Sequence, residues 1–126
     1  MIYNIGMLCK HFKGTDLLEK NIYRIEKLCV NGTDIDESLI TYTGDGDLNT
    51  ATNLVVYANI FQDNKLFCRE YEDISGELSD EKKEMFNQTI KVQPLTDEEI
   101  AIINSDEYVE KKKEFVTKKY SKKTCK

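Results

Sequence analysis

The most apolar stretch of this chain, residues 54–71, limits the possible folds more narrowly than any other segment. It has two arms rich in β-branched and aromatic residues, 54–61 and 65–71, joined by the polar triplet 62–64. Such side chains favour extended backbone, and a short polar segment between two such arms favours a turn. We therefore predict an antiparallel hairpin and a fold built around a β-sheet.

Three other segments have the character of short strands. Residues 8–12 alternate loosely and stop before Gly14, and residues 39–42 form a small apolar island in a polar, acidic stretch that spans residues 31–53. Residues 90–95 also alternate, and they contain the single Pro94, which cannot donate to a neighbouring strand. We expect a last, edge-type strand there and an acidic loop insertion at 31–53.

Residues 16–32 allow two interpretations. Periodicity favours a helix that begins at Asp16 and ends at Gly32, whereas the alternative is a strand over residues 22–30 with a bulge near Lys27. The apolar residues that recur at helical spacing are Leu18, Ile22, Ile25, Leu28 and Cys29.

Helices are expected after the hairpin and at the C-terminus. Ser79 can cap a short helix near residues 80–87, which Met85 and Phe86 would attach to the body. Thr96 and Glu99 form a capping box for a helix near 97–104. A second C-terminal helix near 105–120 has one apolar stripe, and we expect this stripe to dock on the protein's own body in preference to a partner.

Charge is unevenly distributed along the chain. The net charge is −5, but residues 105–126 carry eight Lys against four acidic residues, so the tail is +4 and the remainder is −9. An acidic body disfavours binding of duplex DNA, because Lys and Arg contacts to phosphates supply most of that affinity. The basic tail can still contact an acidic partner. No leader peptide and no membrane-spanning run is present in the sequence, so we expect a cytoplasmic protein with reduced thiols.

The sequence predicts neither a metal site nor a cofactor. Its four Cys residues contain no Cys-x-x-Cys pair, and the lone His11 lies two residues from Cys9. Residues 45–49 resemble the beginning of a calcium loop, but Thr50 stands where such a loop needs Gly and Val56 where it needs Glu. We interpret residues 45–49 as a solvated turn.

Four short signatures follow one another along the chain: His-Phe-Lys-Gly at 11–14, Asn-Ile-Tyr-Arg-Ile at 21–25, Leu-Val-Val-Tyr at 54–57 and Phe-Cys-Arg at 67–69. In this order they resemble the family catalogued as domain of unknown function 1653, over about residues 6 to 95. The resemblance implies a small SH3-like β-barrel of about five to six strands at residues 1–95, of bacterial type and uncharacterised activity. It favours the strand over the helix at 22–30 and leaves residues 96–126 as a helical extension packed on the barrel.

Two departures from the family's pattern concern the loops. Glu70 stands where the family has Pro after its Arg, and the polar stretch that usually follows the second strand has no counterpart in the acidic insertion. Glu70 can donate a backbone hydrogen bond that Pro cannot, so we expect the second hairpin arm to pair as far as Tyr71.

The family match selects four candidate ligand-binding residues: His11, Lys13, Tyr57 and Arg69. They can line a face that binds an anion or a peptide, since Lys and Arg suit phosphate and carboxylate groups. The structural alternative is that Arg69 pairs with Glu70 or Glu72 and that the other residues serve only packing or turns. No residue is predicted to be catalytic, because Cys68, the nearest nucleophile to Arg69, lies in an apolar strand.

Three functions are consistent with these observations. The first is a non-enzymatic binding or adaptor module that uses one barrel face, with a protein or peptide as a possible partner. The second is a small enzyme or a nucleotide- or anion-binding protein, which requires His11, Lys13 and Arg69 to converge in one pocket. The third is single-stranded nucleic-acid binding through the Lys-rich tail and a platform of Tyr23, Tyr57 and other tyrosines.

Overall fold

The computed structural model describes residues 2–30, 41–42 and 53–124. The expected calcium-like turn at 45–49 and most of the acidic insertion at 31–53 therefore lie outside the described residues. The elements follow the order β1 (Leu8–His11), β2 (Ile22–Val30), β3 (Thr41–Tyr42), β4 (Asn53–Asn59), β5 (Lys65–Glu70), α1 (Tyr71–Ile74), α2 (Asp80–Phe86), β6 (Val92–Pro94), α3 (Asp97–Ile103) and α4 (Asp106–Thr124).

The six strands form one mixed sheet with the order β3-β5-β4-β2-β1-β6. All neighbours are antiparallel except β3 and β5, which are parallel. This confirms a small domain that combines one β-sheet with several helices. In the part of the chain that is described, β3 and β6 are the two edges and are not paired with each other, so the sheet is open and the closure of a barrel is not observed.

The ambiguous segment is a strand. β2 covers Ile22–Val30 and pairs with β4 over most of its length and with β1 at Ile22–Arg24, so two other strands hold it in an extended conformation. The register shifts between Ile25 and Lys27, as predicted, so that Glu26 is the extra residue of a bulge. Such a shift changes which residues face the core, and this explains why apolar positions at helical spacing are compatible with a strand.

The β4–β5 hairpin is confirmed, with two differences at its ends. The turn is longer than the triplet, because Ile60 and Phe61 leave the strand and pack near Tyr108, while Asp63 and Asn64 adopt left-handed φ angles of 54° and 52°. The expected extension of β5 to residue 71 is wrong. β5 ends at Glu70, and the chain turns directly into α1.

The three predicted helices are present. Ser79 caps α2, and the reciprocal capping box of Thr96 and Glu99 begins α3. Met85 does not attach α2 to the body, because 56% of its side chain is exposed, whereas the Phe86 ring packs edge-on against Phe12 at 5.4 Å. None of the helices among the described residues combines the length and hydropathy that a membrane crossing requires.

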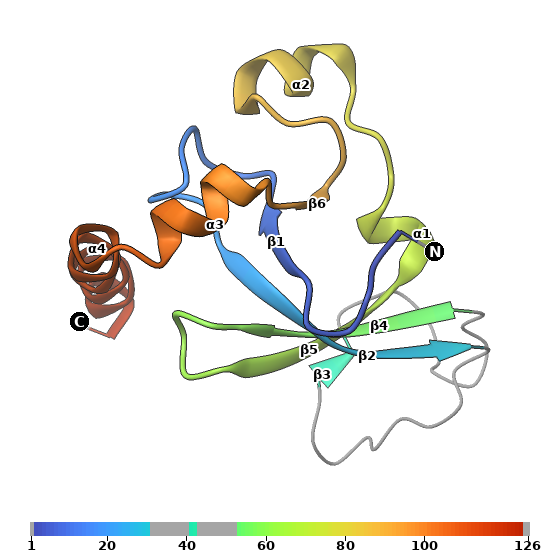
Figure 1. Ribbon diagram of the computed structural model, residues 1–126, viewed down its shortest axis with the longest axis horizontal. Coiled ribbons are helices and arrows are strands. Elements are labelled where there is room, and N and C mark those ends of the chain that lie inside the picture. Colours follow the sequence, from blue (N-terminus) through green and yellow to red (C-terminus); the bar gives the residue numbers. More distant parts are fainter. Residues whose placement is uncertain (1, 31–40, 43–52, 125–126) are drawn as a thin grey trace.

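Helix α4 contacts the protein's own body through two polar anchors. The Tyr108 hydroxyl donates to the Leu17 carbonyl at 2.6 Å, and the buried Lys112 amine donates to the Leu18 and Lys20 carbonyls, both at 2.6 Å. Burial lowers the pKa of Lys112 to about 8. At neutral pH the amine is still mostly protonated, and its N–H groups donate to the two carbonyls. Figure 1 shows α3 and α4 together at one side of the molecule, away from α1 and α2.

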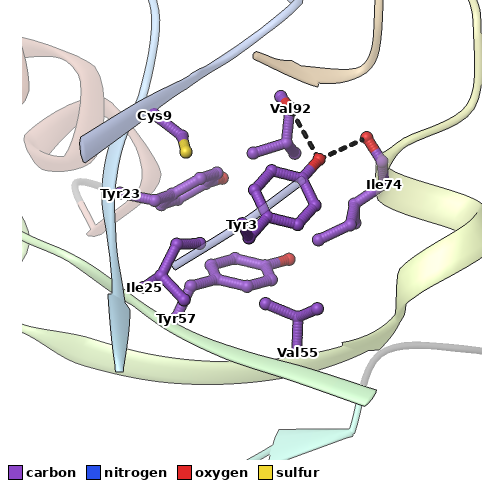
Figure 2. Close-up of a cluster of buried hydrophobic side chains, with 8 residues drawn as sticks. All are labelled: Tyr3, Cys9, Tyr23, Ile25, Val55, Tyr57, Ile74 and Val92. Atoms are coloured by element: carbon purple, nitrogen blue, oxygen red, sulfur yellow. Dashed lines mark hydrogen bonds between the residues drawn. The ribbon is translucent and has the colours of Figure 1, made fainter. Parts of the chain in front are cut away.

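The main core cluster lies between the sheet and the segments that contain α1 and β6. Its centre is Tyr3, of which 1% is exposed and whose hydroxyl hydrogen is shared between the carbonyl oxygens of Val92 at 2.6 Å and Ile74 at 3.2 Å (Figure 2). Burial is the largest cause that raises the pKa of Tyr3, so the hydroxyl stays protonated and able to donate. The cluster comprises Tyr3, Cys9, Tyr23, Ile25, Val55, Tyr57, Ile74 and Val92.

Replacement of Tyr3 by Phe tests this buried hydroxyl. Tyr3→Phe keeps the ring but leaves both carbonyl oxygens without this donor, and we expect it to reduce the free energy of unfolding by about 1 to 3 kcal/mol. Urea denaturation measures the change. Tyr71→Phe is the control, because its hydroxyl accepts only an exposed bond from the Ile2 amide. Equal stability of Tyr3→Phe and the wild type would contradict this role.

Candidate functional site

A cleft of about 300 Å³ lies where β1, β4, β5 and β6 meet α1 and α2. All four residues that the sequence analysis selected line it, although they come from three different strands and one loop. The anion-binding hypothesis required His11, Lys13 and Arg69 to converge in one pocket, and they do so here. The lining residues are His11, Phe12, Lys13, Tyr57, Arg69, Asp73, Ile74, Lys82, Lys91 and Val92.

Arg69 forms an ion pair with Asp73 of α1. Its Nη2 atom donates to Oδ2 of Asp73, and the other carboxylate oxygen of Asp73 accepts a hydrogen bond of 3.1 Å from Lys91 Nζ. Pairing of Arg69 with a neighbouring carboxylate is thus confirmed, but the carboxylate in this ion pair is that of Asp73, because the chain turns into α1 immediately after β5 and places residue 73 beside residue 69. Burial raises the pKa of the Asp73 carboxyl, but the Lys91 hydrogen bond and the Arg69 charge outweigh it and lower the pKa overall.

One donor of Arg69 is not used by this pair. Among the residues that the structure describes, the buried Nε of Arg69 has no hydrogen-bond partner. Nε and Nη2 lie on the same edge of a guanidinium group, which is the edge that carboxylates and phosphates bind in a two-point manner. Asp73 thus occupies only half of the available binding edge.

His11 is held in its neutral form at the wall of the cleft. Its Nδ1 accepts a hydrogen bond of 3.3 Å from the backbone amide of Lys13, and its ring packs near Phe12 and Tyr23. Burial, followed by the positive charges of Lys13 and Arg69, lowers the pKa of His11 to about 4. With Nδ1 as acceptor, the proton of the neutral ring is on Nε2, which makes His11 a donor at neutral pH.

Tyr57 belongs to the floor of the cleft. It is 4% exposed, and its ring lies 4.6 Å from that of Tyr23 and 5.8 Å from that of Phe67 across neighbouring strands. Tyr23 is also buried, with 8% of its surface exposed. These two rings are therefore part of the core, and their faces are not available as a platform on which bases stack.

Lys82 and Lys91 line the cleft but were not singled out by sequence reasoning. Lys82 lies on α2, and its ammonium group sits 5.7 Å from the centre of the Phe12 ring. The buried Lys20 fixes α2 in this place, because its Nζ donates to the carbonyls of Phe12 at 2.8 Å and Phe86 at 3.0 Å. Sequence reasoning placed Lys91 only as part of the alternating segment 90–95. No local pattern connects Lys82 or Lys91 with β1.

The cleft has the opposite charge to the whole molecule. Lys13, Arg69, Lys82 and Lys91 contribute four positive charges and Asp73 one negative charge, which gives +3 in a protein of net charge −5. Positive charges gathered in a concave, partly desolvated site attract anions more strongly than the same charges on an open surface. The arrangement is suited to binding an oxyanion.

Nucleophilic and metal chemistry has little support in this region. Cys68 is fully buried, and burial raises the pKa of its thiol to about 11, so the reactive thiolate is scarce. No group of His, Cys, Asp and Glu residues that can hold a metal ion occurs among residues 2–30, 41–42 and 53–124.

Comparison of the chain with family models, with curated protein sequences and with solved structures finds no match to any of them.

The low pKa of His11 predicts a loss of stability in mild acid. Between pH 6.5 and about 4 the unfolded chain binds a proton on His11 that the folded protein rejects, so stability falls as the pH falls through this window. We expect a loss of about 2 to 3 kcal/mol between pH 6.5 and about 4.5, measured by urea denaturation.

His11→Gln is the control, because it removes the only His of the chain and should remove the pH dependence between pH 6.5 and about 5, above the range in which carboxylates such as Asp73 protonate. The ring proton resonances of His11 in the folded protein should show a midpoint near pH 4. A midpoint above pH 6 would contradict the prediction.

Proposed function

We propose that this protein is a non-enzymatic binding module whose cleft receives a phosphate or carboxylate group of its ligand. The observation that carries the proposal is the gathering of Lys13, Arg69, Lys82 and Lys91 in one cleft of an otherwise acidic protein. Arg bonds oxyanions in a two-point manner, and Lys supplies mobile point charges. Together they fit a small anionic group better than a neutral one.

His11 supports binding over catalysis. A general base is most effective when its pKa lies near the working pH, and a His with a pKa of about 4 is a weak base at neutral pH. The same neutral ring can still donate from Nε2 to an anion. The buried Cys68 is equally unsuited to act as a nucleophile.

We further propose that the open sheet is a variant of the SH3-like barrel and that the chain is a cytosolic relative of the domain of unknown function 1653. The order of the four short signatures supports the relationship. The bulge of β2 at Glu26 supports the fold, since bulges increase the bending of a strand toward barrel-like curvature. In this arrangement residues 96–126 are a helical extension with a basic tail, packed on residues 1–95.

Anion binding is tested by isothermal titration calorimetry of the full chain with inorganic phosphate in a buffer of low ionic strength. We expect binding that weakens as salt is added, because screening reduces the attraction between exposed charges. Arg69→Gln should reduce the affinity by about tenfold or more, since it removes the only two-point donor of the cleft. Lys113→Gln on α4 is the control, because it removes one positive charge outside the cleft.

Two results would overturn the proposal. One is the absence of any heat of binding for phosphate and for acetate up to millimolar concentrations. The other is equal affinity of Arg69→Gln and Lys113→Gln, which would mean that the anion binds by net charge alone and not in the cleft.

A further inference from the structure

We propose that the cleft selects phosphomonoester dianions and that Asp73 is an internal anion which such a ligand displaces from Arg69. This inference rests on the proposed function, since it requires that the cleft binds anions. It adds the chemical class of the ligand and names the residue that sets the selectivity.

Asp73 already occupies the position of a bound oxyanion. Its two carboxylate oxygens accept from two different cations of the cleft, Arg69 through Nη2 and Lys91 through Nζ at 3.1 Å. These oxygens stand in for two oxygens of a ligand's anionic group. Arg69 and Lys91 are thus positioned to bind an oxyanion, and the carboxylate of Asp73 takes the place of that oxyanion.

Asp73 does not supply an acceptor for every donor of Arg69. The Nε of Arg69 is buried and has no partner in the described part of the chain, although it lies on the same edge as the Nη2 that Asp73 binds. A buried donor without an acceptor is destabilising. An oxyanion that replaced Asp73 and bound both Nε and Nη2 would remove this deficit, so displacement has a driving force in addition to charge.

The charge balance favours a dianion over a monoanion. A monocarboxylate that replaced Asp73 at Arg69 would exchange one negative charge for another and would gain little. A phosphomonoester carries close to two negative charges at neutral pH and has three terminal oxygens. Two of these oxygens can bond the Arg69 edge, while the third is available to Lys13 or to the Nε2–H of His11, which line the same cleft.

The geometry allows Asp73 to move without unfolding of the cleft wall. Asp73 is partly exposed on a helix of four residues, whereas the next residue, Ile74, is buried and its carbonyl is held by Tyr3. The side chain of Asp73 can therefore rotate toward solvent while α1 stays in place. A volume of about 300 Å³ lies at the lower end of the range of small-molecule sites, which fits a small phosphorylated compound.

The test uses two probes that share one ring and differ in their anion, phenyl phosphate and benzoate. Titration calorimetry of the full chain at neutral pH and low salt should give an affinity of the wild type for phenyl phosphate at least about tenfold higher than for benzoate. Asp73→Asn removes the internal competitor with almost no change of shape. It should bind both probes more tightly, by about tenfold or more, and should discriminate less between them.

Glu72→Gln is the matched control. It removes the same charge from the neighbouring, exposed position of α1, so it should leave both affinities within about twofold of the wild type. Folding of each variant is checked by circular dichroism. A second readout needs no variant of Asp73: the Nε–H resonance of Arg69, one of two Arg in the chain, should move downfield when phenyl phosphate is added to the wild type.

The possible outcomes distinguish a failure of Asp73 displacement from a failure of anion binding itself. If the wild type binds benzoate as tightly as phenyl phosphate, or if Asp73→Asn binds no more tightly than Glu72→Gln, the displacement of Asp73 is wrong while anion binding stands. An Arg69 Nε–H resonance that does not respond to bound phenyl phosphate would likewise contradict the displacement of Asp73 but not anion binding. If no variant binds either probe, the proposed function and this inference both fail.

Discussion

The cleft depends on one buried hydroxyl group. Tyr3 lies far from Ile74 and Val92 in the sequence, yet its hydroxyl satisfies the carbonyls of both and so joins α1 to the edge strand β6 (Figure 2). Buried carbonyls require such partners, because in the core they have no access to water. The residues that precede these anchors, Asp73 and Lys91, are thereby brought within hydrogen-bond distance and form one side of the cleft.

The cleft can hold several positive charges because the groups around them add little further repulsion. His11 remains neutral, so it adds no repulsion to the four surrounding cations, and its low pKa is the consequence of that environment. Lys20 lies just behind the cleft, where two backbone carbonyls take the place of a counter-ion. Asp73 is the only carboxylate among the lining residues. Asp73 binds Nη2 of Arg69, but among the described residues the Nε of Arg69 has no acceptor. The ion pairs of the cleft therefore leave one donor of Arg69 unused.

The two C-terminal helices support the sheet from a different side and supply no lining residue of the cleft. Lys10 of β1 forms an ion pair of 2.6 Å with Glu99 of α3, and the buried Lys112 of α4 binds the carbonyls of the turn before β2. Each of these anchors places a long cationic side chain on backbone or carboxylate oxygens beside β1 or before β2. The helices therefore anchor β1 and the turn that leads into β2, and β1 carries His11 of the cleft directly after Lys10.

Local sequence determined those elements whose causes are local. The hairpin arms, the Ser79 cap and the Thr96–Glu99 capping box are set by residues a few positions apart, and each was predictable from propensity or from a pair of side chains. Periodicity alone pointed to a helix at residues 16–32, because a bulge at Glu26 shifts the apolar phase of β2 and only its pairing with two other strands decides the matter. Resemblance to a family selected His11, Lys13, Tyr57 and Arg69, but Asp73, Lys82 and Lys91 carry no local signal. Asp73 lies only four residues from Arg69, but it reaches the cleft because β5 turns directly into α1. Lys82 and Lys91 were brought there by tertiary structure alone, since the contacts that place them join residues that are distant along the chain.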